Sequence, residues 1–198
     1  MFQLVVGLGN PGREYVGTRH NVGFAVLDGL VAKFGCSFKS KSRFTAEVAE
    51  TTLPLGRVML AKPLTFMNCS GSAVVALAQW LKIGPGGLLV VVDDADLPLG
   101  RMKVLASGGS GGHNGLRSII EAFGGDEGFT RVRVGIGRSA PVGVGIANHV
   151  LGKFSAAEQA PAQQAVERAM AAVTCALTQG LATAMNEFNR KVMEGEQS

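Results

Sequence analysis

The run "LLVVVD" (Leu88–Asp93) is the most strand-like stretch of the chain. Its near-continuous aliphatic side chains are typical of a strand that is buried on both faces of a sheet. The run ends in Asp93, and Asp94 and Asp96 follow. Ligands bind at the carboxyl ends of strands in open α/β sheets, so these carboxylates mark the edge where a site is expected. Asp93 continues the buried run and therefore needs a partner for its charge.

Hydrophobic periodicity and turn residues predict the elements on either side of this run. Strands are expected at Gln3–Gly7, Phe44–Thr51, Arg57–Lys62, Arg101–Leu105 and Arg131–Ile136. Helices are expected at Gly23–Phe34, Cys69–Leu81, Asn114–Phe123 and Leu181–Val192. Because not every crossover between strands is a helix, this order predicts an α/β fold: a three-layer α/β/α globule with a central mixed, twisted sheet, in one domain spanning residues 1–198.

The Ala-rich C-terminal part of the chain is expected to be helical from Ser155 onward. Ser155 and Glu158 form a capping-box pattern, which is typical of a helix start. Pro161 stands where it would break a continuous helix. The pattern therefore predicts a short turn, followed by a helix from about Pro161 that ends at Gly180.

Composition excludes several classes of protein. The chain has 198 residues, 46% of them hydrophobic, and no run approaches the roughly 18–20 apolar residues of a membrane span. The first apolar run has no basic segment before it and is interpreted as a strand, not a signal peptide. Three cysteines without a C-x-x-C pair argue against a disulfide framework and a cysteine zinc site, and favour the cytoplasm. The net charge of +4 is compatible with a polyanionic partner.

Two glycine-rich stretches match well-known motifs formally. The stretch Gly7–Gly12 ("GLGNPG") satisfies G-x-G-x-x-G, but Asn-Pro-Gly is a turn signal and no helix follows directly, so a nucleotide cofactor is disfavoured. The stretch Gly108–Gly112 ("GGSGG") satisfies G-x-S-x-G around Ser110. Asp126 and His149 follow in the chain order of a serine hydrolase, which stays open as an alternative.

His20 is the strongest candidate for a general base. It lies on the loop after the first strand, which opens on the same sheet edge as Asp93. A histidine beside a buried carboxylate is held in one tautomer and can accept a proton. A loop histidine bonded to backbone is the alternative for His20 taken alone. His113 begins a predicted helix as a cap neighbour, and His149 is interpreted as structural.

Three asparagines stand at the ends of predicted elements: Asn10, Asn68 and Asn114. Side-chain amides suit a site that grips an ester or amide carbonyl without charge. Each asparagine taken alone is more often a cap or turn residue. Together with His20 and Asp93, the three indicate a hydrolytic site for a carbonyl substrate.

Five segments together resemble the bacterial peptidyl-tRNA hydrolase family: "VGLGNPGREYVGTRHNVGF", "KPLTFMNCSG", "VVDDADLPLG", "GGSGGHNGLRSI" and "FTRVRVGIGR". They keep the family's order and spacing over residues 5–138, and "HVLGKF" extends the match to Phe154. The resemblance implies a monomeric, cytoplasmic hydrolase that cleaves the ester between a peptide and the 3′ end of tRNA. It implies peptidyl-tRNA as the partner, and neither a cofactor, a metal nor a membrane.

The resemblance also implies roles for individual residues. His20 matches the catalytic base, Asp93 the carboxylate that supports it, and Asn10 the residue that distinguishes blocked from free aminoacyl ends. Four further positions match substrate contacts: Tyr15, Phe66, Asn68 and Asn114. A non-catalytic RNA-binding relative of the same fold is the alternative, and the presence of both His20 and Asp93 favours the enzyme.

The chain departs from the family at two positions. Many relatives carry lysine where this chain has Leu105, and there it clamps the tRNA 5′ phosphate together with the match to Arg133. Arg101 or Lys103 would have to compensate, so Arg133 and Lys103 are the expected phosphate contacts. Many relatives also carry histidine where Ser110 stands.

Overall fold

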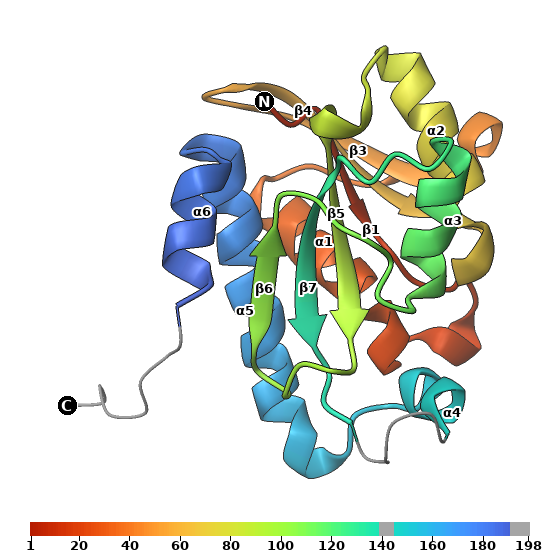
Figure 1. The fold of residues 1–198 in the computed structure, drawn as a ribbon, viewed down its shortest axis with the longest axis vertical. Coiled ribbons are helices and arrows are strands. Elements are labelled where there is room, and N and C mark those ends of the chain that lie inside the picture. The colour runs from red at the N-terminus through yellow and green to blue at the C-terminus, as the bar shows by residue number, and fades with distance from the viewer. Residues whose placement is uncertain (139–144, 191–198) are drawn as a thin grey trace.

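The computed structural model describes residues 1–138 and 145–190 and shows a mixed seven-stranded sheet between helical layers (Figure 1). The strands lie in the order β2-β3-β4-β1-β5-β7-β6. Their bounds are Leu4–Gly7 (β1), Lys39–Lys41 (β2), Ala46–Leu53 (β3), Gly56–Pro63 (β4), Leu88–Asp94 (β5), Met102–Leu105 (β6) and Thr130–Gly135 (β7). Strand β1 pairs in parallel with β4 and β5, and β5 in parallel with β7, whereas the remaining pairs are antiparallel.

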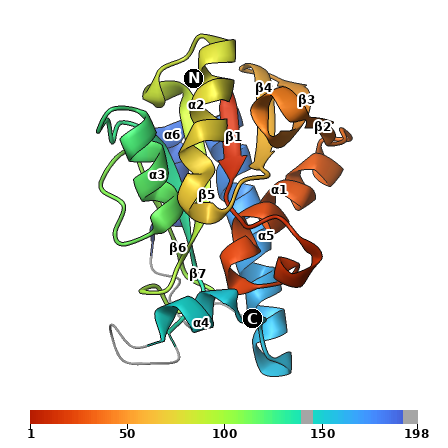
Figure 2. The same cartoon turned by 90° about the vertical axis from the view of Figure 1, so that its right-hand side faces the viewer.

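Helices cover both faces of the sheet (Figure 2). Their bounds are Val22–Lys33 (α1), Ser70–Leu81 (α2), Asn114–Ala122 (α3), Ile146–Leu151 (α4), Ala156–Thr178 (α5) and Leu181–Phe188 (α6). One buried cluster joins the sheet to α1 and α5, and a second joins it to α2 and α3. The predicted α/β class with a central mixed sheet is confirmed. No described helix is both long enough and apolar enough to cross a membrane.

The first glycine of the G-x-G-x-x-G match is required by packing. A Cβ atom on Gly7 would lie 2.2 Å from the carbonyl oxygen of Gly23, and one on Gly23 would lie 2.5 Å from the backbone nitrogen of Leu8. The two glycines therefore let the start of α1 lie directly against the end of β1. Gly12 follows with φ of 116°, which favours glycine and turns the chain toward the next loop.

The sequence prediction for the C-terminal part was wrong at Pro161. Helix α5 runs through Pro161 without a break, from Ala156 to Thr178. The capping box of Ser155 and Glu158 fixes the helix start, and Pro161 lies in the second turn. There the missing N–H leaves only the carbonyl of Ala157 without its helical partner, a loss that the buried face of α5 outweighs.

Three further elements differ from the prediction. Strand β2 and helix α4 were not expected, because three exposed residues and one short helix carry too little periodicity. Helix α6 ends at Phe188, before the expected Val192, which lies outside the described residues. The next side chain, Asn189, accepts a hydrogen bond from the backbone of Val104 at 2.7 Å and donates one back at 2.9 Å. This amide closes the free edge of β6.

Candidate active site

The centre of the site lies where β5 ends and a short 3₁₀ turn, η2 (Arg19–Asn21), crosses in front of it. His20 Nδ1 lies 2.8 Å from Oδ1 of Asp93. Asp93 is the penultimate residue of β5, and its side chain is only 3% exposed. The structure therefore brings together the two residues that the sequence placed at one sheet edge.

A second histidine contacts the same carboxylate oxygen. His113 Nε2 lies 3.0 Å from Asp93 Oδ1. The other ring nitrogen, Nδ1, caps helix α3 by accepting the backbone N–H groups of Gly115 at 3.1 Å and Leu116 at 3.3 Å. An accepting Nδ1 carries no proton, so the proton of the neutral ring is on Nε2 and is donated to Asp93. Sequence reasoning found the cap and missed this contact.

The two rings have different capacities for proton transfer. Both nitrogens of His113 are used, one by the helix cap and one by the carboxylate. His20 donates its Nδ1 proton to Asp93, which leaves Nε2 without a proton and available as an acceptor. Both rings line the cavity described below, so the difference between them is the free Nε2 of His20. Of the two, only His20 can serve as a general base.

The charge of Asp93 is held in place by its neighbours. Burial acts to raise the pKa of this carboxyl, but the charges and hydrogen bonds of His113 and His20 outweigh it and hold the pKa well below its usual range. Asp93 is therefore ionised wherever the protein is folded near neutral pH. An ionised carboxylate keeps the Nδ1 proton on His20 and stabilises the imidazolium that forms when Nε2 takes up a proton.

Asn10 is buried and held from both sides. Asn21 accepts the backbone N–H of Asn10 at 2.9 Å and donates to its carbonyl at 2.9 Å. The backbone N–H of Met67 donates to Asn10 Oδ1 at 2.8 Å. Asn10 also lines the cavity described next, and its Nδ2 group is left as a donor.

A cavity of about 550 Å³ opens beside these groups. It is lined at its base by Asn10, His20, Asp93 and His113, and its walls include Asn68, Asn114, Phe66 and Arg133. Phe66 is 57% exposed at the rim, and Tyr15 packs edge-on against it with 6.4 Å between ring centroids. Tyr15 thus supports Phe66 and does not itself line the cavity. Helix α4 supplies an apolar wall through Ile146, Val150 and Leu151.

Arg19 anchors the turn that carries His20. Its guanidinium is buried, donates to the carbonyl of Lys153 at 2.8 Å and pairs with Glu158 at 2.7 Å. It also lies over the ring of Phe154, 5.1 Å from the centroid. The start of α5 therefore fixes η2 from behind. Sequence reasoning assigned no role to Arg19, because its partners lie more than 130 positions away.

The Arg19–Glu158 contact gives a pH-dependent prediction. Hydrogen bonds from the Ser155 backbone, the Ser155 side chain and Arg19 lower the pKa of Glu158 to about 2 from its ordinary 4.5. A lowered pKa means that the ionised carboxylate stabilises the fold above about pH 4.5, and that this contribution is lost as the pH falls toward 2.

Glu158→Gln keeps a capping side chain and removes the charge. We expect it to lower the free energy of unfolding by about 1 kcal/mol or less at neutral pH, because the pair is partly exposed. The difference from wild type should shrink in acid. Urea unfolding at neutral and acidic pH measures it, and a difference that grows in acid would contradict the assignment.

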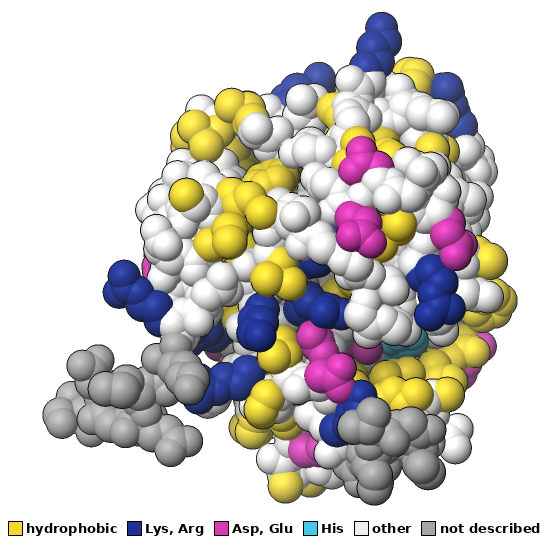
Figure 3. Space-filling view, viewed as in Figure 1, with side chains coloured by type: hydrophobic (Ala, Val, Ile, Leu, Met, Phe, Trp, Pro, Cys, Tyr) yellow, Lys and Arg dark blue, Asp and Glu magenta, His cyan; other side chains and the backbone are white. Residues whose placement is uncertain are grey.

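The expected phosphate contacts lie beside the cavity on β7 and β6. Arg133 pairs with Asp94, with 3.2 Å between Nε and Oδ2, and donates to the Ser110 carbonyl at 3.2 Å. Lys103 lies directly opposite Arg133 in the antiparallel register and is exposed. Figure 3 shows lysine and arginine side chains over these strands. Arg131 does not join them, because it is fully buried and bonded to the carbonyl of Gly108.

The structure does not assemble the serine-hydrolase alternative. Asp126 precedes β7 at the amino edge of the sheet and accepts the backbone N–H of Gly128 at 2.7 Å. His149 lies on α4 beyond the opposite edge, with Nε2 2.8 Å from the carbonyl of Gly137. No hydrogen bond joins either residue to Ser110 within the described ranges. The G-x-S-x-G match is therefore a loop that Arg133 holds.

His20, Asp93 and His113 are also the cluster in the described part of the chain that could bind a metal ion. A metal on Nε2 of His113 would need the proton on Nδ1. That nitrogen already accepts two backbone N–H groups, so metal binding would break the cap of α3. The donors fit a hydrogen-bonded triad better than a metal centre.

Fold and site define an α/β protein with a histidine–carboxylate pair at the carboxyl edge of its sheet. The family model described as peptidyl-tRNA hydrolase matches residues 4–196, so the chain belongs to the peptidyl-tRNA hydrolase family. A relative of that name from Synechococcus sp. (strain JA-3-3Ab) is 49% identical, covering 94% of this chain and 82% of the relative. One from Syntrophomonas wolfei is 46% identical, covering 94% and 100%.

Solved structures agree with this membership. The crystal structure of peptidyl-tRNA hydrolase from Acinetobacter baumannii superposes with a TM-score of 0.89 at 36% identity, covering 95% of this chain and 94% of that one. The same enzyme class in complex with N-propanol gives a TM-score of 0.88 at 37% identity. The family resemblance drawn from the sequence is confirmed.

Proposed function

We propose that this protein hydrolyses the ester bond between a peptide and the 3′ end of tRNA, as a monomer in the cytoplasm. The observation that supports it best is the contact of His20 Nδ1 with Asp93, which leaves Nε2 to accept a proton, beside a cavity lined by side-chain amides. An ester needs an activated water, a positioned carbonyl and donors for the oxyanion, all of which these groups supply. Membership of the peptidyl-tRNA hydrolase family supports the choice of substrate.

The reaction follows from the proton positions. Nε2 of His20 takes a proton from water as its oxygen attacks the ester carbonyl, and Asp93 stabilises the imidazolium. The proton then passes to the departing 3′ oxygen of the ribose as the C–O bond breaks. The amides of Asn68 and Asn114 are proposed to hold the substrate in the cavity that they line.

The orientation of Asn10 supports a preference for blocked ends. The backbone of Met67 already donates to the side-chain oxygen, and we propose that the Nδ2 group of Asn10 is the one that meets the substrate. A peptide carbonyl accepts a hydrogen bond from this donor, whereas a free α-ammonium group has only protons to offer and would face it unpaired. We therefore propose that Asn10 selects peptidyl over aminoacyl ends.

The release of N-acetyl-amino acid from N-acetyl-aminoacyl-tRNA tests this function, with free aminoacyl-tRNA as the control. We expect rapid cleavage of the blocked substrate and at least tenfold slower cleavage of the free one. RNA binding without release would establish the non-catalytic alternative instead.

Removal of metal ions should leave the activity unchanged. Because Nδ1 of His113 accepts the hydrogen bonds that cap α3, which disfavours a metal on Nε2, EDTA is expected to have no effect on the rate of release. The measurement is the initial rate with and without EDTA at saturating substrate. Loss of activity that Mg²⁺ or Zn²⁺ restores would show that the triad binds a metal.

The phosphate contact gives a prediction that separates binding from chemistry. Lys103→Ala should raise KM for full-length substrate several-fold and reduce the salt dependence by about one counterion, with kcat unchanged. Hydrolysis of a short 3′-terminal fragment should not change. Arg133→Ala should act likewise and also loosen the Ser110 loop. If both variants keep the KM and salt dependence of wild type, the tRNA is bound elsewhere.

A further inference from the structure

A basic and aromatic surface lies at the β2 edge of the sheet, away from the cavity. It is formed by β2, the turn η3 (Ser42–Phe44) and the end of α2. Trp80 is 54% exposed there and is the single tryptophan of the chain. The guanidinium of Arg43 lies over its indole ring, 4.5 Å from the centroid, and the ring of Phe44 packs 6.1 Å away. The indole ring of Trp80 is thus exposed to solvent, with the guanidinium of Arg43 stacked on it.

The charged side chains of this surface are all cationic. Its cations are Lys39, Lys41, Arg43 and Lys82, all of them exposed. None of the four has an ion-pair partner among the described residues. The segments that form the surface, residues 39–44 and 76–82, contain no aspartate or glutamate. On the neighbouring strand β3, Glu47 pairs with Lys62 and Glu50 with Arg57. Four unneutralised cations around one aromatic platform form an electrostatic footprint for a polyanion.

The basic Trp80 surface is separate from the proposed catalytic site. Helix α2 begins at Ser70, beside the cavity-lining Asn68, and carries Trp80 at its far end, roughly 15 Å along the axis. A hollow of about 480 Å³ beside Trp80 shares no lining residue with the catalytic cavity. Strand β2 and the strand β6 that carries Lys103 are the two opposite edges of the sheet. The Trp80 surface is therefore distinct from both the cavity and the strand that carries Lys103.

We propose that the basic Trp80 surface is a second RNA-binding site, which takes a single-stranded RNA segment other than the acceptor end of the substrate. Bases stack on aromatic rings and on guanidinium planes, and the Arg43–Trp80 pair offers both. The lysines at its flanks contact phosphates without reading sequence. An acidic peptide would satisfy the charge and leave the aromatic platform unused, so RNA fits the surface better. The site goes beyond the proposed hydrolysis and does not depend on it.

The single tryptophan makes the site directly measurable. Titration of the wild-type protein with a short oligouridylate, excited at the red edge of the indole absorption, should quench or shift the fluorescence of Trp80. Four released counterions predict a slope of about −3 for log K against log salt. Poly-glutamate of equal charge tests the peptide alternative. If poly-glutamate perturbs Trp80 as strongly as oligouridylate, or if neither does, the proposal is wrong.

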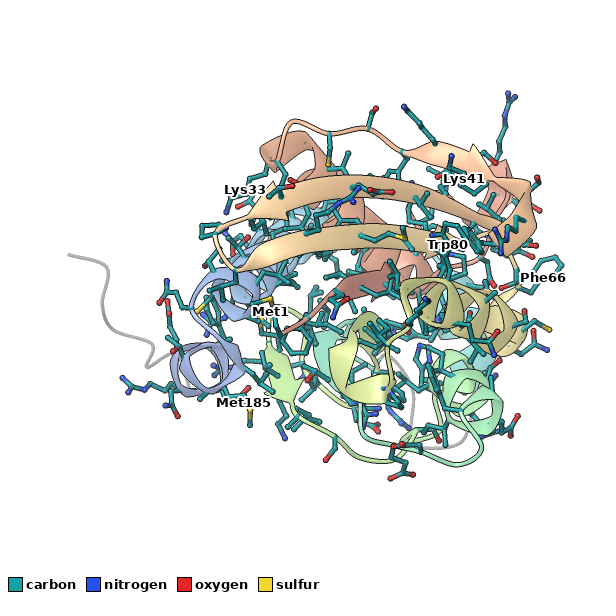
Figure 4. All side chains as sticks on the ribbon, turned by 90° about the horizontal axis from the view of Figure 1, so that it is seen from above. Met1, Lys33, Lys41, Phe66, Trp80 and Met185 are labelled. Atoms are coloured by element: carbon teal, nitrogen blue, oxygen red, sulfur yellow. The ribbon has the colours of Figure 1, made fainter. Side chains whose placement is uncertain are left out.

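Charge-reversal variants separate this site from general attraction to a basic protein. Arg43→Glu and Lys41→Glu should weaken binding of labelled oligouridylate by about tenfold or more, measured by anisotropy. Lys33→Glu makes the same change in net charge at the end of α1, away from Lys41 and Trp80 (Figure 4), and should weaken binding far less. All three should hydrolyse a short 3′-terminal substrate at the wild-type rate. Equal weakening by Lys33→Glu would overturn the proposal.

Discussion

Replacing His20 by alanine should lower the rate of peptide release by about 10²–10⁴-fold and leave the fold intact. The reason is that His20 lines the cavity with only Nδ1 engaged, while both nitrogens of His113 are engaged. The measurement is kcat on N-acetyl-aminoacyl-tRNA, with circular dichroism and thermal unfolding to verify the fold.

His149→Ala is the matched control for this variant. It removes an imidazole that lies outside the cavity, against the carbonyl of Gly137, and should retain most of the activity. Full activity in His20→Ala would contradict the assignment and return attention to His113.

Asp93→Asn should lower kcat by about a hundredfold or more with little change in KM. The asparagine oxygen can still accept from both rings, but the side chain no longer carries the charge that stabilises imidazolium. Its NH₂ group also enters a buried position in which both neighbours, His20 and His113, are donors. The loss of charge destabilises the transition state, and the NH₂ group disfavours the tautomer of His20 that carries its proton on Nδ1.

Asp126→Asn makes the same chemical change at the opposite edge of the sheet and should leave kcat as in wild type. An unchanged kcat in Asp93→Asn would mean that Asp93 only accepts hydrogen bonds from its neighbours and that its charge plays no part in catalysis. A large rise in KM with unchanged kcat would instead assign Asp93 to substrate binding.

Local sequence patterns predicted the frame of the site well. The buried run of β5 and the topology of α/β sheets place Asp93 at a carboxyl edge, and the loop after β1, which carries His20, must open on that same edge. Both inferences need only chain order and side-chain burial. The resemblance to a known family added roles to these residues, and those roles remain predictions for kinetics to test.

Contacts set by crossover geometry could not be predicted in this way. His113 contacts Asp93 because the N-terminus of α3 lies at the carboxyl end of β5. No short-range sequence pattern encodes this placement. The Asn10–Asn21 clasp and the Arg19–Glu158 pair depend likewise on loops meeting across the fold. Arg131 and Arg133 are two positions apart on β7 and therefore point to the same face of the strand. Even so, Arg131 is buried, whereas Arg133 lines the cavity.

The protonation pattern of the rings tests the central claim most directly. With three histidines in the chain, long-range ¹⁵N–¹H NMR spectra of ¹⁵N-histidine-labelled protein can assign each ring nitrogen. Near neutral pH we predict that His20 carries its proton on Nδ1 with Nε2 bare, and that His113 carries its proton on Nε2 with Nδ1 bare. A proton on Nε2 of a neutral His20 would leave no acceptor for water in the cavity and would contradict the account.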